Sequence, residues 1–319
     1  MKIPIHTPSF YTSSVWDFFT MKGAAILFDQ AVYEYVEAKS EGRRKVRPNT
    51  LEGYLSAIKC HLMPKWSGRE MESITADELQ AWVDGFDKVG AARKAFGTFR
   101  QIMRWYLRAY RVRIWDETQA VELPTAPRRK PNALTASQAK SALRDMRGCD
   151  FEPAALVQLS CGLRPCEAIA LTWADVNLST GAVKVDKGLH EAFGEVYQSP
   201  TKTEKSTRTV VLPRYAVERL RELRRAVNPR KADRLCSLAP GAYRRHVRSW
   251  FARRGVRMCA QWLRHTFGTL QLQAGTQIET VALMLGHEGV STAYEHYLVG
   301  NSALMRDAQR SFSSLITCA

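Results

Sequence analysis

The stretch Gln261-Trp262-Leu263-Arg264-His265-Thr266 is followed downstream by Leu285-Gly286-His287 and then by Tyr297. An arginine, a histidine and a tyrosine therefore stand in this order on a basic chain. Arginine binds phosphate oxygens with a fork of N–H donors that stays charged at any working pH. A phenol can act as a nucleophile in covalent catalysis. The stretch predicts a site that grips a phosphate and attacks it with a tyrosine.

Length and charge agree with a polyanionic partner. The chain has 319 residues, enough for two domains, and its 47 Lys and Arg against 31 Asp and Glu leave a net charge of +16. Such a balance attracts nucleic acid first and a membrane surface second. No window approaches the ~18 consecutive apolar residues of a membrane span, and the N-terminus lacks an apolar signal segment. We expect a cytoplasmic protein.

The first part of the chain reads as helical. Residues 1–23 have no clear period and stay unassigned as an N-terminal leader. Apolar residues recur at helical spacing over 26–39, and a second helix is expected over 50–61, with Pro64 closing that segment. A capping box at Thr75 to Glu78 opens a further helix. We expect a helical domain over 24–118, followed by a proline-rich basic linker over 119–133.

The helix expected over 92–110 has two distinct stripes. Its aromatic and apolar residues recur at steps of three and four and predict one buried face. Its basic residues fall on another stripe, roughly a third of a turn away by the ~100° per residue of an α-helix. These are Arg93, Arg100, Arg104, Arg108 and Arg111. Solvated arginines are the alternative, but five arginines without an acid on one stripe favour contact with phosphates.

The remaining residues, 134–319, form a second expected domain. A capped helix opens at Thr135, and three short β-like runs follow over 181–185, 195–199 and 206–212. We expect these runs to pair as one small antiparallel sheet. Helical periodicity returns after Pro213. The predicted fold class is mostly α with a small antiparallel β-sheet, as a helical domain plus an α+β domain that ends in a tail helix.

Taken together, the motifs resemble the tyrosine recombinase (phage integrase) family. Gly162-Leu163-Arg164-Pro165-Cys166-Glu167 joins two helical runs through a glycine turn, and Thr201-Lys202-Thr203 lies between two β-like runs. With Arg264, His287 and Tyr297 they reproduce the family's order of arginine, lysine, arginine, histidine and tyrosine. The resemblance covers about residues 135–300 well, and the helical region is similar to the family's SAM-like core-binding domain.

The resemblance implies a role for each matched residue. Arg164 and Arg264 would bind the non-bridging oxygens of a phosphodiester, and Lys202 would protonate the leaving 5′-oxygen. His287 would hydrogen-bond the phosphate or the attacking oxygen. Tyr297 would form a covalent 3′-phosphotyrosine, which needs neither a metal nor another cofactor. Glu167 follows Arg164 on the same helical face, where it would orient the arginine or form a plain surface ion pair.

Two positions depart from the family pattern. Gln261 occupies the slot that usually holds histidine, and glutamine can donate or accept a hydrogen bond but cannot take a proton. Tyr294 and Tyr297 both lie near the expected place of the nucleophile, and family spacing favours Tyr297. Because the two tyrosines would share a helical face, sequence alone leaves Tyr294 open.

The predicted function is a site-specific recombinase that integrates or excises a mobile element. Its expected partners are double-stranded DNA, three further copies of the chain in a homotetramer, and a possible directionality factor, with no membrane. The expected tail helix, after Ala303, has an apolar stripe that could pack on its own domain; the resemblance implies instead that it passes to a neighbouring subunit. A type IB topoisomerase that relaxes DNA is one alternative. A catalytically impaired DNA-binding relative is the other, with Gln261 as its first sign.

Overall fold

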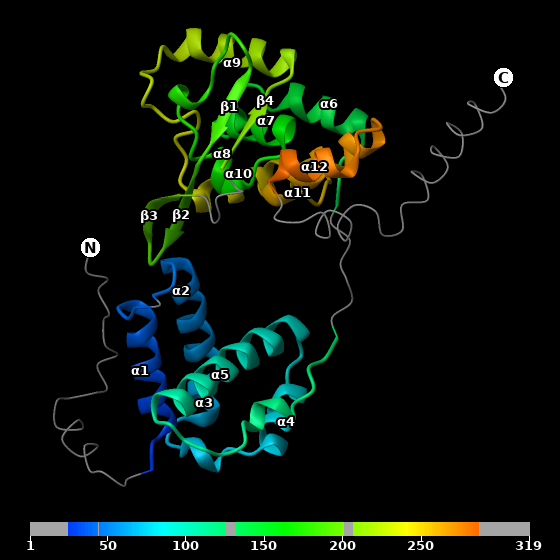
Figure 1. Ribbon diagram of the computed structural model, residues 1–319. Coiled ribbons are helices and arrows are strands. Elements are labelled where there is room, and N and C mark those ends of the chain that lie inside the picture. The colour runs from blue at the N-terminus through cyan, green and yellow to red at the C-terminus, as the bar shows by residue number, and fades with distance from the viewer. Residues whose placement is uncertain (1–24, 44, 126–131, 201–206, 287–319) are drawn as a thin grey trace, which may run out of the picture. The chain divides into compact units, whose positions relative to one another are not determined.

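The computed structural model describes residues 25–43, 45–125, 132–200 and 207–286. The chain divides into two compact units, Met1–Arg128 and Arg129–Ala319. The first unit is helical, and the second combines helices with short strands (Figure 1). Among the described residues, no helix is long and apolar enough to cross a membrane.

The first unit is built from five α-helices, with one π-helical turn and two short 3₁₀ segments, over its described residues. In order these are α1 Phe28–Ser40, α2 Pro48–Ala57, the π turn Ile58–Leu62, α3 Met63–Trp66, the 3₁₀ segment Met71–Ser73, α4 Ala76–Asp84, α5 Val89–Ala109 and the 3₁₀ segment Glu117–Gln119. Helix α5 supplies much of the core with its apolar stripe, including Phe96, Phe99 and Tyr106. Rings from other helices, such as Phe28 stacked on Phe99 at 5.6 Å, complete it.

The expected helix end at Pro64 is wrong. The chain leaves α2 through the π turn Ile58–Leu62 and continues directly into α3, with Pro64 in the first turn of that helix. A proline is tolerated in a first turn because the missing N–H has no partner to lose there. The π turn changes the hydrogen-bond pattern just before the proline, so the chain stays helical as far as Trp66. Trp66 is fully buried.

The second unit begins with the predicted capped helix. Thr135 accepts from the backbone N–H of Gln138, whose side chain in turn accepts from Thr135 N, so both halves of a capping box are present. The elements are α6 Ala136–Asp145, α7 Glu152–Cys161, α8 Pro165–Ala168, the 3₁₀ segment Trp173–Asp175, β1 Ala182–Val185, β2 Lys187–Ala192, β3 Glu195–Pro200, β4 Arg208–Val211, α9 Arg214–Val227, α10 Pro240–Ala252, α11 Ala260–Gln273 and α12 Ile278–Leu285.

The strands form two antiparallel pairs rather than the single three-stranded sheet that the sequence predicts. Strand β1 pairs with β4, and β2 pairs with β3. Strand β2 is not predicted from the sequence, because Lys187, Gly188 and Glu191 have low β propensity. The turn after β2 is not predicted from the sequence either. Phe193 and Gly194 both have positive φ, as in a two-residue type I′ hairpin turn, but phenylalanine is an unusual residue at the first of these positions. The fold class itself, mostly α with small antiparallel β elements, is confirmed.

The buried core of the second unit is centred on α7. Every residue of this helix except Pro153 is buried, and the helix packs against α8, α9 and α11 (Figure 1). Its Gln158 accepts a hydrogen bond from Tyr243 of α10 and donates one to the carbonyl of Ala260, the first residue of α11. Helix α7 therefore fixes the start of the helix that carries Arg264 relative to the turn that carries Arg164.

Candidate active site

A left-handed glycine at the end of α7 forms the centre of the site. Gly162 has a φ of 68° and caps the helix, as the predicted glycine turn requires. A Cβ atom at this position would lie 2.4 Å from the Phe267 ring and 2.6 Å from the Leu285 side chain. Only glycine satisfies both the backbone angle and the close packing. The turn after α7 is thus pressed against α11 and the end of α12.

Arg164 follows this turn and is held by Glu167. The Glu167 carboxylate accepts from the Arg164 backbone N–H at 2.8 Å and from its Nη1 at 2.8 Å. Glu167 is only 3 % exposed, so the alternative of a surface ion pair is wrong. The Arg164 side chain itself remains 35 % exposed. The guanidinium is therefore held by the protein, while part of the side chain stays open to a ligand.

Arg264 reaches the same turn from α11. Its side chain is buried, with the whole residue 3 % exposed, and its Nη1 donates to the carbonyl of Gly162 at 3.0 Å. Arg164 also donates from Nη2 to the carbonyl of Gly286 at 3.3 Å. The structure thus brings together both predicted arginines around Gly162, at the place where α12 ends.

A third arginine, which the sequence motifs do not indicate, also belongs to the site. Arg208 opens β4, its side chain is 8 % exposed, and its Nη2 donates to Glu167 Oε2 at 2.9 Å. Burial alone would raise the pKa of the Glu167 carboxyl. The hydrogen bonds and charge of Arg208, with the charge of Arg164, outweigh burial and hold that pKa below its usual value. A signal was present in the sequence, because Arg208 shares a strand face with the buried Val210.

The remaining predicted residues differ in their placement. Gln261 is exposed in the first turn of α11, and Arg264 follows it on the same helix. Lys202, His287, Tyr294 and Tyr297 lie outside the described residues, as does the expected tail helix. On either side of Lys202, the described chain ends at Pro200 and resumes at Thr207. It ends again at Gly286, one residue before His287.

We expect Gln261→His to retain or raise the rate of DNA cleavage. Histidine would restore a group that can carry positive charge beside a phosphate. Because the N-terminal end of a helix disfavours a cation, that charge would form mainly when a phosphate is bound. The measurement is the cleavage rate at saturating protein, with DNA affinity as the control. A collapse of cleavage in a stably folded variant would show that the pocket depends on glutamine.

The predicted arginine stripe is present in part on α5. Arg93, Arg104 and Arg108 are exposed, and Arg100 is half-buried. Arg111 lies beyond the helix end, with a φ of 54°, so its place on the stripe is wrong. The helix ends at Ala109 because a non-helical residue follows its cap. Arg104 Nε also lies 3.5 Å from Asp116 Oδ2. Asp116 belongs to the segment after α5, so this acid could not be seen from the helix alone.

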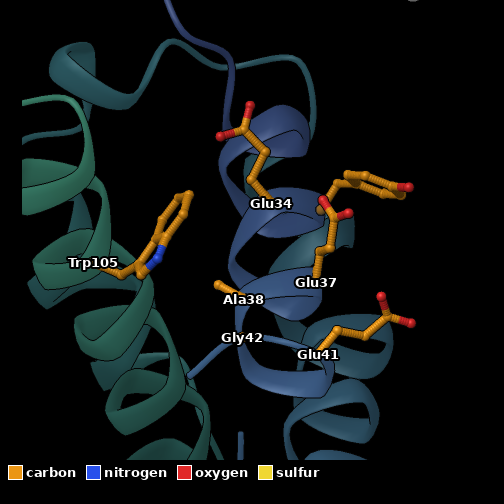
Figure 2. A pocket seen from close by; sticks show the side chains of 7 residues that line it. Glu34, Glu37, Ala38, Glu41, Gly42 and Trp105 are labelled. Atoms are coloured by element: carbon orange, nitrogen blue, oxygen red, sulfur yellow. The ribbon is translucent and has the colours of Figure 1, made fainter. Parts of the chain in front are cut away.

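A hollow between α1 and α5 has the opposite charge. Glu34, Glu37 and Glu41 line it together with Trp105 (Figure 2). No lysine or arginine is among its lining residues. Carboxylates repel phosphate, so this face of the helical unit does not suit a nucleic-acid backbone. Within the first unit, the exposed arginines of α5 are the better candidate surface for phosphate.

Comparison with known proteins finds phage integrase family matches in both units. Residues 132–302 match the phage integrase family, and residues 27–86 match the N-terminal SAM-like domain of phage integrases. The tyrosine recombinase XerD of Halalkalibacterium halodurans is 25 % identical over 290 residues, covering 84 % of this chain and 93 % of XerD.

Two solved structures share the fold. A segment of the Tn1549 transposon integrase in complex with transposon right end DNA superposes with a TM-score of 0.70 at 16 % identity, covering 88 % of this chain and 99 % of the solved integrase chain. A lambda integrase tetramer bound to a Holliday junction gives a TM-score of 0.66 at 16 % identity, covering 86 % of this chain and 78 % of lambda integrase.

Proposed function

We propose that this chain, which belongs to the phage integrase family, cuts and rejoins DNA through a covalent 3′-phosphotyrosine at Tyr297. The chain is a site-specific DNA recombinase of the tyrosine class, as its family and its relatives indicate. One observation carries the mechanistic proposal. Arg164 and Arg264 come from segments far apart in sequence, and both are fixed around the Gly162 turn.

The two arginines would bind one scissile phosphate. As a nucleophile attacks in line, negative charge grows on the non-bridging oxygens, and preorganised guanidinium groups stabilise that charge. The Arg164 side chain is 35 % exposed, which leaves it open to this contact. Arg264 is buried and directed by the Gly162 carbonyl, so it needs little reorganisation when the phosphate arrives.

The proposed chemistry balances without an added cofactor. The Tyr297 oxygen bonds to phosphorus while the bond from phosphorus to the 5′-oxygen breaks. Lys202 gives its proton to the leaving 5′-oxygen, the phenolic proton passes to water, and His287 hydrogen-bonds the phosphate or the attacking oxygen. Attack by the 5′-hydroxyl of another strand reverses these steps and releases the tyrosine. The phosphotyrosine conserves the bond energy, so rejoining needs no ATP.

We further propose that the chain acts on the ends of a mobile element as a homotetramer. The support is likeness: a transposon integrase solved on transposon end DNA and a lambda integrase tetramer on a Holliday junction share its fold. In the same proposal, the tail after Ala303 is exchanged between subunits, and a directionality factor binds the assembly as a partner. The protein acts in the cytoplasm. Within the helical unit, we assign the exposed Arg93, Arg104 and Arg108 of α5 and the half-buried Arg100 to the DNA backbone.

Reversing Arg100 and Arg104 to glutamate should weaken DNA binding far more than it lowers stability. Each lost phosphate contact should reduce the slope of log affinity against log salt by about 1, so a drop of about 2 is expected. The measurement is DNA affinity across a salt series, with thermal unfolding as the control. Asp116→Asn alone removes the charge that faces Arg104 and keeps the arginine, so it separates loss of the Asp116 contact from loss of DNA contact. Unchanged affinity at moderate salt would remove α5 from the DNA side.

Mapping covalent protein–DNA junctions tests the function as a whole. The full-length protein is incubated with genomic DNA of its host, denatured without protease, and the protein-linked DNA ends are sequenced. We expect 3′-linked ends that cluster at one or a few related sequences. Junctions scattered without sequence preference would favour a topoisomerase. An absence of protein-linked ends, with DNA binding retained, would favour a DNA-binding relative without cleavage activity.

A further inference from the structure

We infer that Arg208 is a positioning residue for strand cleavage, because its guanidinium fixes Glu167 and the end of α12 and thereby sets the position of Arg164. The inference rests on the proposed function. Arg208 joins three segments: β4, where it lies, the short helix α8 with Glu167, and α12, whose Met284 carbonyl accepts from Nε at 2.9 Å. No residue role predicted from the sequence included it.

Glu167 is shared between two arginines. Its Oε1 accepts from Arg164 Nη1 at 2.8 Å and from Arg208 Nη1 at 3.3 Å. Its Oε2 accepts from the Arg164 backbone N–H at 2.8 Å and from Arg208 Nη2 at 2.9 Å. A carboxylate with hydrogen bonds at both oxygens is restrained in rotation as well as position. Arg208 therefore fixes the group against which Arg164 is aligned.

The two arginines differ in exposure, and the difference separates their roles. The Arg208 side chain is 8 % exposed, whereas that of Arg164 is 35 % exposed. Arg208 lies on the protein side of the carboxylate, and Arg164 faces outward. Two guanidinium groups around one carboxylate leave a net positive charge, so Arg164 stays attractive to a phosphate. Without Arg208, Glu167 would neutralise Arg164 and compete with the phosphate for its N–H groups.

Gly286 provides independent evidence that the path of Arg208 is specified. A Cβ atom at Gly286 would lie 3.0 Å from Arg208 Nη1, 3.1 Å from its Cδ and 3.3 Å from its Cζ. The residue has a φ of 66°, and its carbonyl accepts from Arg164 Nη2. The end of α12 thus contacts both arginines at once. Glycine suits the left-handed backbone angle, and a larger residue would have to displace the Arg208 side chain.

The test compares Arg208→Met with a matched control, Arg219→Met, in the full-length protein. Arg219 also makes a two-point contact with a buried carboxylate, through Nε to Glu152 Oε1 at 2.6 Å and Nη2 to Glu152 Oε2 at 3.1 Å. The described structure places that pair away from the Gly162 turn, on α9 and α7. Both changes remove an arginine from a buried glutamate, so they should cost comparable stability.

The DNA probe is a duplex that carries the junction sequence mapped with the unchanged protein. For Arg208→Met we expect DNA affinity close to that of the unchanged protein and a covalent-adduct rate about 100-fold lower, the scale of a catalytic group misplaced by ~1 Å. For Arg219→Met we expect an adduct rate per folded molecule within about twofold of the unchanged protein. Arg208→Lys should recover part of the rate, because it restores the charge but not the fork.

A second background shows whether Arg208 acts through Glu167. The Glu167→Gln protein has no carboxylate for Arg208 to hold. Adding Arg208→Met to it should therefore change the covalent-adduct rate by less than about twofold, which is the usual error of additivity between mutations. Equal losses in Arg208→Met and Arg219→Met, or full additivity with Glu167→Gln, would reduce Arg208 to a structural role. If the unchanged protein forms no adduct on the mapped duplex, the proposed function fails first, and the inference fails with it.

Discussion

We expect the Tyr297→Phe protein to bind its DNA site with unchanged affinity and to form no covalent adduct. Phenylalanine keeps the ring and removes only the oxygen that would attack phosphorus. Loss of a nucleophile removes nearly all catalysis, so adduct formation should fall by at least about 10⁴-fold. Denaturing electrophoresis of protein mixed with labelled duplex measures the adduct directly.

Tyr294→Phe is the matched control for this change. It removes a hydroxyl from a neighbouring tyrosine and should leave adduct formation within a few-fold of the unchanged protein. The reverse pattern, in which adduct persists in Tyr297→Phe and disappears in Tyr294→Phe, would assign the nucleophile to Tyr294. The resemblance to the family would then hold, but its spacing would not apply to this chain.

Arg264→Lys should lower the cleavage rate by about 10² to 10³-fold, the range found when one preorganised donor to a developing oxyanion is removed. Lysine keeps the charge but cannot bond the Gly162 carbonyl and hold a phosphate bidentately at the same time. DNA affinity should change far less, because many other basic residues contact the backbone in this account. Single-turnover cleavage at saturating protein separates the two effects.

Arg219→Lys is the control for replacing a buried arginine with lysine. Its pair with Glu152 lies in the same unit but outside the site, so the change should lower stability without lowering cleavage per folded molecule. Similar cleavage losses in Arg264→Lys and Arg219→Lys would mean that buried arginines support the fold and not the reaction.

Features that depend on neighbours in sequence could be predicted. The apolar stripe of α5 follows from the helical period, and its Phe96, Phe99, Met103 and Tyr106 are buried. The capping boxes at Thr75 and Thr135 need only residues three positions apart, and both are present. Local hydrogen bonding and side-chain periodicity fix these elements, so the rest of the fold does not override them.

Features that depend on distant residues could not be predicted. Nothing in the sequence near Lys187 indicates that β2 forms, because pairing with β3 stabilises it across an unusual turn at Phe193. The π turn that carries the helix past Pro64 is likewise set by packing around Trp66. The contact between Arg104 and Asp116 joins a helix to the segment after it, which a single-helix stripe cannot show.

The candidate site divides in the same way. Residue types and order identified Arg164 and Arg264, but not that both would be fixed around the carbonyls of Gly162 and Gly286. Arg208 was missed because its partners, Glu167 and Met284, lie far away in sequence. The roles of Lys202, Gln261, His287 and Tyr297 remain predictions from the motif.

The central claim is that Tyr297 carries the DNA, and identifying the linked residue tests it most directly. The adduct formed on the mapped duplex is trimmed with nuclease, cut with a glutamate-specific protease and analysed by mass spectrometry. Cleavage after Glu295 separates Tyr294 from Tyr297 into different peptides. The account predicts a nucleotide mass on the peptide that begins at His296. The same mass on the peptide that ends at Glu295, or on any other residue, would contradict it.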